Sequence, residues 1–275
     1  MPILNNKSWR YPITPSGRAS FLDIVTEPSH RIAGDMTIIS FDADPAAVRD
    51  YTPEPLALDG SGRMYLFNYE GWHYSDLMHT EFVSEKRLQY AESYVMVPCT
   101  LDGTRYYYML YSWVNRDWLA YLGRHAGMPH KIADVQFSHF HGADAQYAGL
   151  AAGVRWSACV ECLGLVLRAS ISFEREYAAQ EMSVPFDSAN PKHVGRRMFW
   201  DVCHSRPLLD DLVAHWGDDL ATGAIWGGPA TLTFHDAENE EVLPFQPLRV
   251  HEGVQFPLRF THATSPPVVL HRFGD

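Results

Sequence analysis

The sequence predicts a mainly β protein, an antiparallel β-barrel or sheet with a few short helices. Along most of the chain, apolar residues recur closer to every second position than to the helical period. Aromatic and β-branched residues gather in short runs separated by turn residues, which is typical of strands. The 275 residues suffice for one large core, and no internal repeat or linker divides them. A single domain spanning residues 1–275 is therefore expected.

The N-terminal third predicts an arm, a strand, a short helix and a second strand. Residues 1–30 are rich in Pro, Ser and Asn and predict an irregular arm. Residues 35–41 form a β-rich run, and residues 44–50 predict a helix with Asp44 as its N-cap and Pro45 in its first turn. Residues 63–69 predict the next strand, with aromatic side chains on one alternation.

The middle of the chain carries a strong hairpin signal. Two strand-like runs, 93–101 and 105–113, flank the Asp102-Gly103 pair, which favours a tight turn. Residues 115–122 then predict a helix that ends at Gly123 as its C′ glycine. Further strands are expected at 135–140, 153–160, 163–173, 198–202, 208–214, 223–225, 231–235 and 254–261, with a long connection over 174–196.

Composition excludes some classes of partner. A formal net charge of -11 argues against nucleic acid and against an anionic membrane surface, because both require clustered Lys and Arg. No apolar run reaches the length of a membrane span, and the first residues lack the apolar core of a signal peptide, so a cytoplasmic protein is expected.

Neither a metal nor a cofactor is expected. Cys159 and Cys162 lie three positions apart in a strand-like run, so they point to opposite faces and predict reduced structural thiols. His139 and His141 share a strand face, but no third ligand or carboxylate accompanies them in the sequence nearby, which favours a surface or structural role.

One short segment suggests chemistry. Pro129-His130-Lys131 follows a turn and enters an alternating apolar run. Lysines are mostly exposed, so a surface lysine is the ordinary interpretation of Lys131. The alternative is a nucleophile, because removal of an amine from water favours its neutral form.

Four segments together resemble the acetoacetate decarboxylase family. They occur in family order, from about residue 30 to the C-terminus, and comprise 51–59 (with Thr-Pro-Glu-Pro-Leu), 90–93 (Tyr-Ala-Glu-Ser, followed by Val-Pro and Asp-Gly), 123–133 and 226–234 (with Trp-Gly-Gly-Pro). The resemblance implies a Schiff-base-forming lyase, assembled as a homo-oligomer, that acts on a small keto acid. Its reaction is either decarboxylation of a β-keto acid or aldolase-dehydratase chemistry on a 2-oxo acid.

The resemblance also implies catalytic residues. Counted from Gly123-Arg124, Lys131 falls on the Schiff-base position; counted from Pro129, His130 does. Lys131 is the only amine of the segment and is the expected nucleophile, with His130 as an acid–base or modulating neighbour. Glu92 matches the family glutamate that lies near the lysine and either handles protons or orients the substrate.

Other family positions differ in this sequence. The family's second glutamate is absent from 63–69 or displaced to Glu70. The family's substrate-binding arginine falls near Gly34, with Arg31 the nearest candidate. The expected substrate-binding residues are Arg31, Tyr90, Phe67 and Met128. These departures predict a changed substrate or reaction. They also leave open an alternative, a non-catalytic protein on the same fold that binds a small ligand or serves in assembly.

Overall fold

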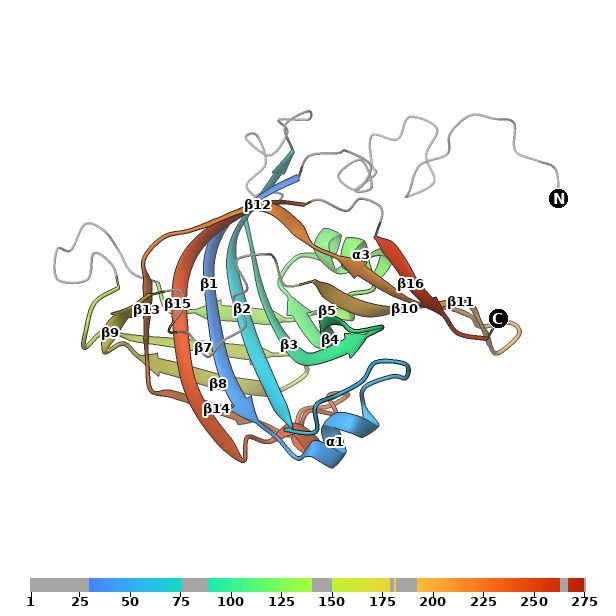
Figure 1. Ribbon diagram of the computed structural model, residues 1–275, viewed down its shortest axis with the longest axis horizontal. Coiled ribbons are helices and arrows are strands. Elements are labelled where there is room, and N and C mark those ends of the chain that lie inside the picture. The colour runs from blue at the N-terminus through green and yellow to red at the C-terminus, as the bar shows by residue number, and fades with distance from the viewer. Residues whose placement is uncertain are drawn as a thin grey trace.

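A computed structural model describes residues 30–75, 89–139, 150–178, 181, 192–262 and 267–274. It confirms a mainly β architecture of two sheets (Figure 1). The larger sheet has twelve described strands in the order β16 (Val268–Arg272), β11 (Arg206–His215), β10 (His193–Asp201), β4 (Thr104–Val114), β3 (Gln89–Leu101), β2 (Arg63–Ser75), β1 (His30–Asp42), β15 (Arg249–His262), β13 (Ile225–Gly228) and β9 (Arg175–Tyr177), with β12 (Gly217–Thr222) beside β15 and β5 (His130–Ile132) beside β4. The smaller sheet is β14 (Ala230–Phe234), β8 (Leu165–Ser172), β7 (Arg155–Glu161) and β6 (Asp134–Phe137).

The large sheet is open and mixed rather than a closed antiparallel barrel. Among the described strands its order runs from β16 at one edge to β9 at the other. Most neighbours are antiparallel, but β4 pairs in parallel with both β10 and β5. The parallel pair with β5 follows from the crossover through α3 (Asp117–His125), which returns the chain in the direction of β4.

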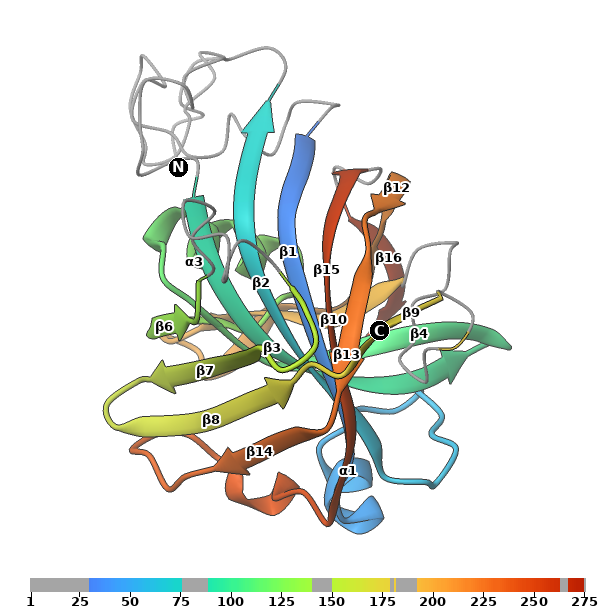
Figure 2. The same ribbon diagram turned by 90° about the vertical axis from the view of Figure 1, so that its left-hand side faces the viewer.

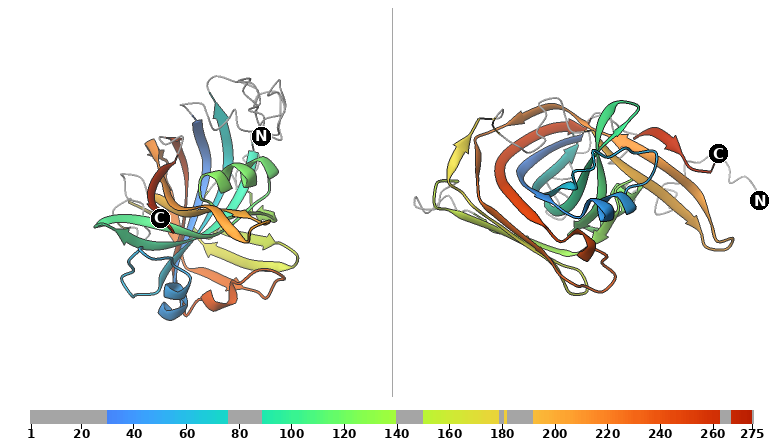
Figure 3. Two further views of the ribbon diagram at one scale, coloured as in Figure 1. Left: turned by 90° about the vertical axis from the view of Figure 1, so that its right-hand side faces the viewer. Right: turned by 60° about the horizontal axis from the view of Figure 1, so that its bottom comes forward.

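The strongly curved large sheet has two buried faces (Figure 3). One face packs on the small sheet, which crosses it (Figure 2), and the core between them is built around Trp156, Phe173 and Phe234. The other face carries a second apolar cluster rich in tyrosine, covered in part by α3. Because side chains alternate along each strand, neighbouring residues such as Glu92 and Ser93 serve different faces.

Local signals in the sequence correctly located two elements. Helix α1 (Pro45–Asp50) begins after Asp44, whose carboxylate accepts a hydrogen bond from the backbone N–H of Ala46 at 2.9 Å. The β3–β4 hairpin turns at Asp102 and Gly103, whose φ angles of 49° and 77° are the left-handed values that an Asp-Gly turn provides.

The expected end of the second helix was wrong. Gly123 lies inside α3, and the chain leaves the helix at Gly127, whose φ is +82°. The glycine at 123 has another reason: a Cβ there would lie 2.1 Å from Nδ1 of His130. Position 123 must therefore lack a side chain so that the imidazole can pack on the helix.

Short strands at sheet margins were the elements that the pattern missed. These are β5, β9, β12 and β16, together with a 3₁₀ turn at Leu243–Phe245. Several other strands start earlier or end later than expected; β10, for example, begins at His193, inside the predicted connection. The expected N-terminal arm at 1–30 lies, except for residue 30, outside the described residues.

Within the described residues, no helix has both the length and the apolar character needed to cross a bilayer.

Candidate functional site

Three adjacent strands bring Glu92, Ser112 and His130 together on the tyrosine-rich face of the large sheet. Ser112 on β4 pairs with Tyr94 of β3 on one side and with His130 of β5 on the other. Oε1 of Glu92 lies 2.9 Å from Nε2 of His130, and the hydroxyl of Ser112 donates to the same oxygen at 2.9 Å. The structure thus joins two predicted residues and adds Ser112, which the sequence analysis missed; its signal was a small polar residue within an apolar strand.

The proton arrangement at His130 follows from its second nitrogen. Nδ1 lies 3.0 Å from the backbone carbonyl oxygen of Leu119 in α3. A carbonyl only accepts, so Nδ1 carries a hydrogen. Nε2 then either accepts a proton from Glu92 or donates one to its carboxylate. In both cases one proton lies between these two atoms, which is the arrangement a proton-transfer pair requires.

Burial isolates this pair from water. The side chain of His130 is fully buried, and that of Glu92 is 10% exposed. Burial, together with the nearby Glu92 carboxylate, holds the pKa of Tyr90 and Tyr94 well above the usual tyrosine range. Tyr94 stacks on Phe67 with ring centroids 5.1 Å apart. The pair therefore lies in an aromatic environment of low polarity, where electrostatic interactions are strengthened.

Two further histidines lie on the same face. The ring of His193 is 6.1 Å from that of Tyr94 and 5.2 Å from that of His215. Burial lowers the pKa of His193 to about 4, although the charge of Glu92 works in the other direction. His193 is therefore a neutral imidazole at physiological pH.

Lys131 points to the other face of β5, as strand alternation requires. Its Nζ donates to Oε1 of Glu240 at 3.0 Å and to the backbone carbonyl of Asn239 at 2.7 Å. The Glu240 side chain is 1% exposed, and its second oxygen accepts from the indole N–H of Trp113 at 3.2 Å. The structure therefore separates Lys131 from Glu92 and His130 and joins it to a buried carboxylate.

The expected substrate-binding residues divide into two groups. Tyr90 and Phe67 lie on the Glu92 face, and Met128 packs against the same apolar cluster. Arg31 is exposed near the start of β1, beside a different hollow that includes Asp219 and Arg259. It does not join the group around Glu92.

The position near which the family arginine was expected has no free space. A Cβ at Gly34 would lie 2.7 Å from the hydroxyl of Tyr69 and closer still to the backbone of β2. A residue with a side chain at 34 would displace β2 or Tyr69, so no arginine fits at this position without a shift of its neighbours.

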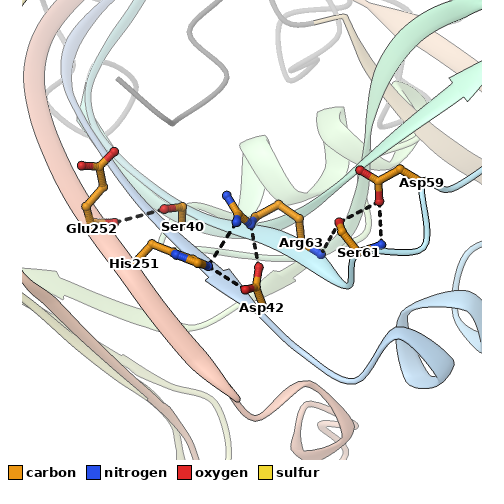
Figure 4. Close-up of polar contacts among 7 residues, drawn as sticks. All are labelled: Ser40, Asp42, Asp59, Ser61, Arg63, His251 and Glu252. Carbon is orange, nitrogen blue, oxygen red and sulfur yellow. Dashed lines mark hydrogen bonds and ion pairs between the residues drawn. The ribbon is translucent and has the colours of Figure 1, made fainter. Parts of the chain in front are cut away.

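A second polar cluster lies at the opposite end of the same strands (Figure 4). One carboxylate oxygen of Asp42 accepts a hydrogen bond from Nε of Arg63 at 2.7 Å, and the other lies 2.7 Å from Nε2 of His251. Partial burial raises the pKa of Asp42, but the hydrogen bonds from Arg63 and His251 outweigh it and lower that pKa. This cluster ties β1, β2 and β15 together and has the geometry of a structural ion pair.

The described residues contain no group of three or more potential metal ligands. His139 contacts Glu70 through Nδ1 at 3.2 Å, while His141 lies outside the described residues. All four cysteines are free, and burial raises the pKa of Cys159 and Cys162, so these thiols stay protonated at neutral pH.

Comparisons with known proteins agree with this picture. The family model for acetoacetate decarboxylase matches residues 10–271. Among solved structures, the enduracididine biosynthesis enzyme MppR, complexed with the condensation product of pyruvate and imidazole 4-carboxaldehyde, is similar at a TM-score of 0.84 and 22% identity, with 96% of each chain covered.

Two other solved structures extend the comparison. An acetoacetate decarboxylase-like enzyme from Sphingomonas wittichii RW1 has a TM-score of 0.84 and 20% identity, over 96% of this chain and 99% of that one. The acetoacetate decarboxylase of Legionella pneumophila has a TM-score of 0.72 and 14% identity, over 90% and 89%. No curated protein matches the chain.

Proposed function

Because the chain belongs to the acetoacetate decarboxylase family, we propose that it is a lyase of small keto acids in which Glu92 and His130 transfer the proton. The observation that carries this proposal is the buried 2.9 Å contact between Oε1 of Glu92 and Nε2 of His130. The contact of Nδ1 with Leu119 fixes the ring so that only Nε2 is available for exchange. MppR forms complexes with pyruvate and with a pyruvate condensation product, which supports a 2-oxo acid as the substrate class.

The proposed pair serves either of the two reactions expected from the sequence. In aldol chemistry on a 2-oxo acid, it removes a proton from the carbon beside the ketone, and the electron pair moves to the carbonyl oxygen as an enolate. In decarboxylation of a β-keto acid, the bond to the carboxylate breaks and carbon dioxide leaves. The pair then donates a proton to the resulting enolate carbon. Ser112 holds the Glu92 carboxyl in place during both steps.

We further propose that the reaction proceeds without an iminium on Lys131. An iminium requires a free primary amine at the reacting carbonyl. The Lys131 amine is instead engaged by Glu240 and by the Asn239 carbonyl, on the face of β5 opposite Glu92. His130 follows Pro129 and faces Glu92, but an imidazole lacks the two hydrogens on one nitrogen that imine formation consumes.

Deuterium exchange and trapping test these statements together. The methyl protons of pyruvate are followed by NMR in D₂O, and carbon dioxide release from acetoacetate is measured in parallel. Glu92→Gln and His130→Asn are each expected to slow the preferred reaction by about 100-fold or more. Lys131→Arg, the matched control, keeps its ion pair with Glu240 and is expected to stay within about threefold of wild type.

Borohydride separates the alternatives. If reduction in the presence of either acid inactivates the wild type and peptide mapping finds the adduct on Lys131, the iminium mechanism holds and this proposal is overturned. If the wild type binds either acid saturably but turns over neither, the non-catalytic ligand-binding alternative is favoured.

We also propose that the chain forms a homo-oligomer through β10, β11 and β16, which extend to one side of the molecule (Figure 1). Large apolar side chains are exposed there: Met198, Trp200, Val202, Leu208 and Val268. Clusters of this kind mark association surfaces. Sedimentation velocity of the wild type and of Trp200→Glu with Leu208→Glu tests this; an unchanged mass would refute the assignment.

A further inference from the structure

A cavity of about 460 Å³ lies between the two sheets, on the face of the large sheet opposite Glu92 and His130. Residues of β1, β2, β13 and β15 line it on one side, and residues on and beside β6 and β7 line it on the other. Strands β1 to β3 separate it from the proton-transfer pair, because Asn68 and Tyr69 alternate between the two faces. It is therefore distinct from the site proposed above.

The floor of the cavity is a row of polar side chains in register across neighbouring strands. Asn68 of β2 pairs with Thr37 of β1, which pairs with Gln255 of β15. All three line the cavity, and none is more than 6% exposed. Polar side chains placed this deep between two packed sheets are costly unless they have hydrogen-bond partners.

Two of these side chains have unused hydrogen-bonding atoms. Oδ1 of Asn68 accepts from the hydroxyl of Ser93 at 2.9 Å, but its Nδ2 has no partner; Oε1 of Gln255 also has none. A rotation of the Asn68 amide would exchange its two atoms and still leave one without a partner. The floor thus contains buried polar atoms without partners, a feature that native structures rarely retain without a ligand or water.

The next row toward the mouth carries two carboxylates. Asp35 of β1 pairs with Glu70 of β2, and both line the cavity. Partial burial raises the pKa of each, although nearby His139 opposes this, and for Glu70 the charge of Asp35 adds to the increase. A cation placed between them would relieve both the desolvation and the mutual repulsion.

The walls are aromatic. Trp226 of β13, Trp156 of β7 and Phe137 of β6 all line the cavity. Faces of aromatic rings attract organic cations, and tryptophan does so most strongly. Residues two apart on a strand are separated by roughly 7 Å, so the carboxylate row and the amide row mark the two ends of a ligand of about that length.

We propose that this cavity binds a small organic cation, a primary ammonium compound whose far end carries a hydroxyl group, which can both accept from Nδ2 of Asn68 and donate to Oε1 of Gln255. The ammonium lies at Asp35 and Glu70, the body of the ligand contacts Trp226 and Trp156, and the polar end satisfies Asn68 and Gln255. Such a ligand meets every unsatisfied group on the floor and the charge at the mouth.

Tyramine is a suitable probe because it has an ammonium, an aromatic ring and a hydroxyl in this order. Binding to the whole chain is measured by titration calorimetry, with 4-ethylphenol and 3-(4-hydroxyphenyl)propionate as neutral and anionic analogues. Saturable binding is expected for tyramine, with 4-ethylphenol at least about tenfold weaker and the anion weaker still.

Matched variants locate the probe. Asp35→Asn with Glu70→Gln is expected to weaken tyramine at least about tenfold, and Asn68→Leu to weaken both tyramine and 4-ethylphenol. Glu92→Gln, on the opposite face, is expected to bind tyramine like wild type. Thermal melts identify any variant that has lost its fold. If Asn68→Leu does not fold, the carboxylate variant still tests the site, because its two changes preserve side-chain shape.

Three results would overturn the proposal: no saturable tyramine binding by wild type, unchanged affinity in the carboxylate variant, or loss of binding in Glu92→Gln. The last would place the probe at the proton-transfer pair instead. Because none of these measurements depends on turnover, failure of the proposed lyase activity would leave this test intact.

Discussion

Replacement of Lys131 by methionine separates a structural role of this lysine from a catalytic one. The change keeps much of the aliphatic stem and removes the ammonium that lies 3.0 Å from Oε1 of Glu240. The Glu240 side chain is only 1% exposed, so water cannot replace the lost ammonium. One strong donor to the carboxylate remains, the indole N–H of Trp113 at 3.2 Å. An uncompensated charge would then remain buried beside Trp113.

The structure sets the size of the effect. Removal of one member of a buried ion pair costs about 3–5 kcal/mol. The side chain of Lys131 is 39% exposed, so water reaches its end of the pair, and we discount the loss to about 2–3 kcal/mol. With an unfolding entropy of about 2.1 cal/mol/K per residue, a chain of 275 residues should lose about 3–5 °C in Tm.

The assay is a comparison of thermal melts for wild type, Lys131→Met, Glu240→Gln and the double variant. Glu240→Gln should cost less than Lys131→Met, because the half-exposed ammonium can be hydrated whereas the buried carboxylate cannot. The double variant should recover most of the loss. A Lys131→Met protein that melts like wild type, or a double variant whose losses simply add, would refute the assigned ion pair.

Two other variants test the surroundings of Glu92. Gly123→Ala should destabilise the fold by about 1–3 kcal/mol and lower activity, because its Cβ would meet Nδ1 of His130 at 2.1 Å. At an ordinary helical site the same change stabilises a protein by about 1 kcal/mol. An increase in Tm would therefore contradict the contact between position 123 and His130. His193 has a folded pKa of about 4, below its unfolded value, so the unfolded chain binds more protons between about pH 6.5 and 4. Stability should therefore decrease as the pH is lowered through this window, by about 3 kcal/mol. His193→Asn should flatten this part of the pH–stability curve in denaturant titrations, and an unchanged slope would exclude His193 as its source.

Elements with a local cause were the ones that the sequence predicted well. Asp44 and Pro45 determine the start of α1, and Asp102 with Gly103 determines the β3–β4 turn, because each signal acts within a few residues. The strands β5 and β12 have three and six residues, and they exist through pairing with β4 and β15. No local pattern specifies such partners.

The candidate site divides in the same way. Glu92 and His130 were identified from short segments that resemble a family, and the structure brings them into contact. The partner of Lys131 was not predictable, because Glu240 lies 109 residues further along the chain, in a segment that looks like a solvated turn. Gly123 was misread as a helix terminator since its real constraint, the ring of His130, acts across seven residues and two elements.

The last prediction concerns the two possible registers of the Pro129-His130-Lys131 segment. Only His130 faces Glu92 and the tyrosine-rich cluster, so a lysine at this position would place an amine where the carboxyl of Glu92 and an apolar wall surround it. The position offers the desolvation that favours a neutral amine, which the half-exposed site of Lys131 does not.

His130→Lys should therefore gain borohydride-sensitive trapping with pyruvate that the wild type lacks, with the adduct mapped to residue 130. Combination with Lys131→Arg should leave the gain intact, because that change preserves the ion pair with Glu240. Trapping at Lys131 in either protein would show that the amine leaves its carboxylate to reach substrate. In that case the pairing with Glu240 would be a resting state, and the counting of the motif from Gly123-Arg124 would be the correct one.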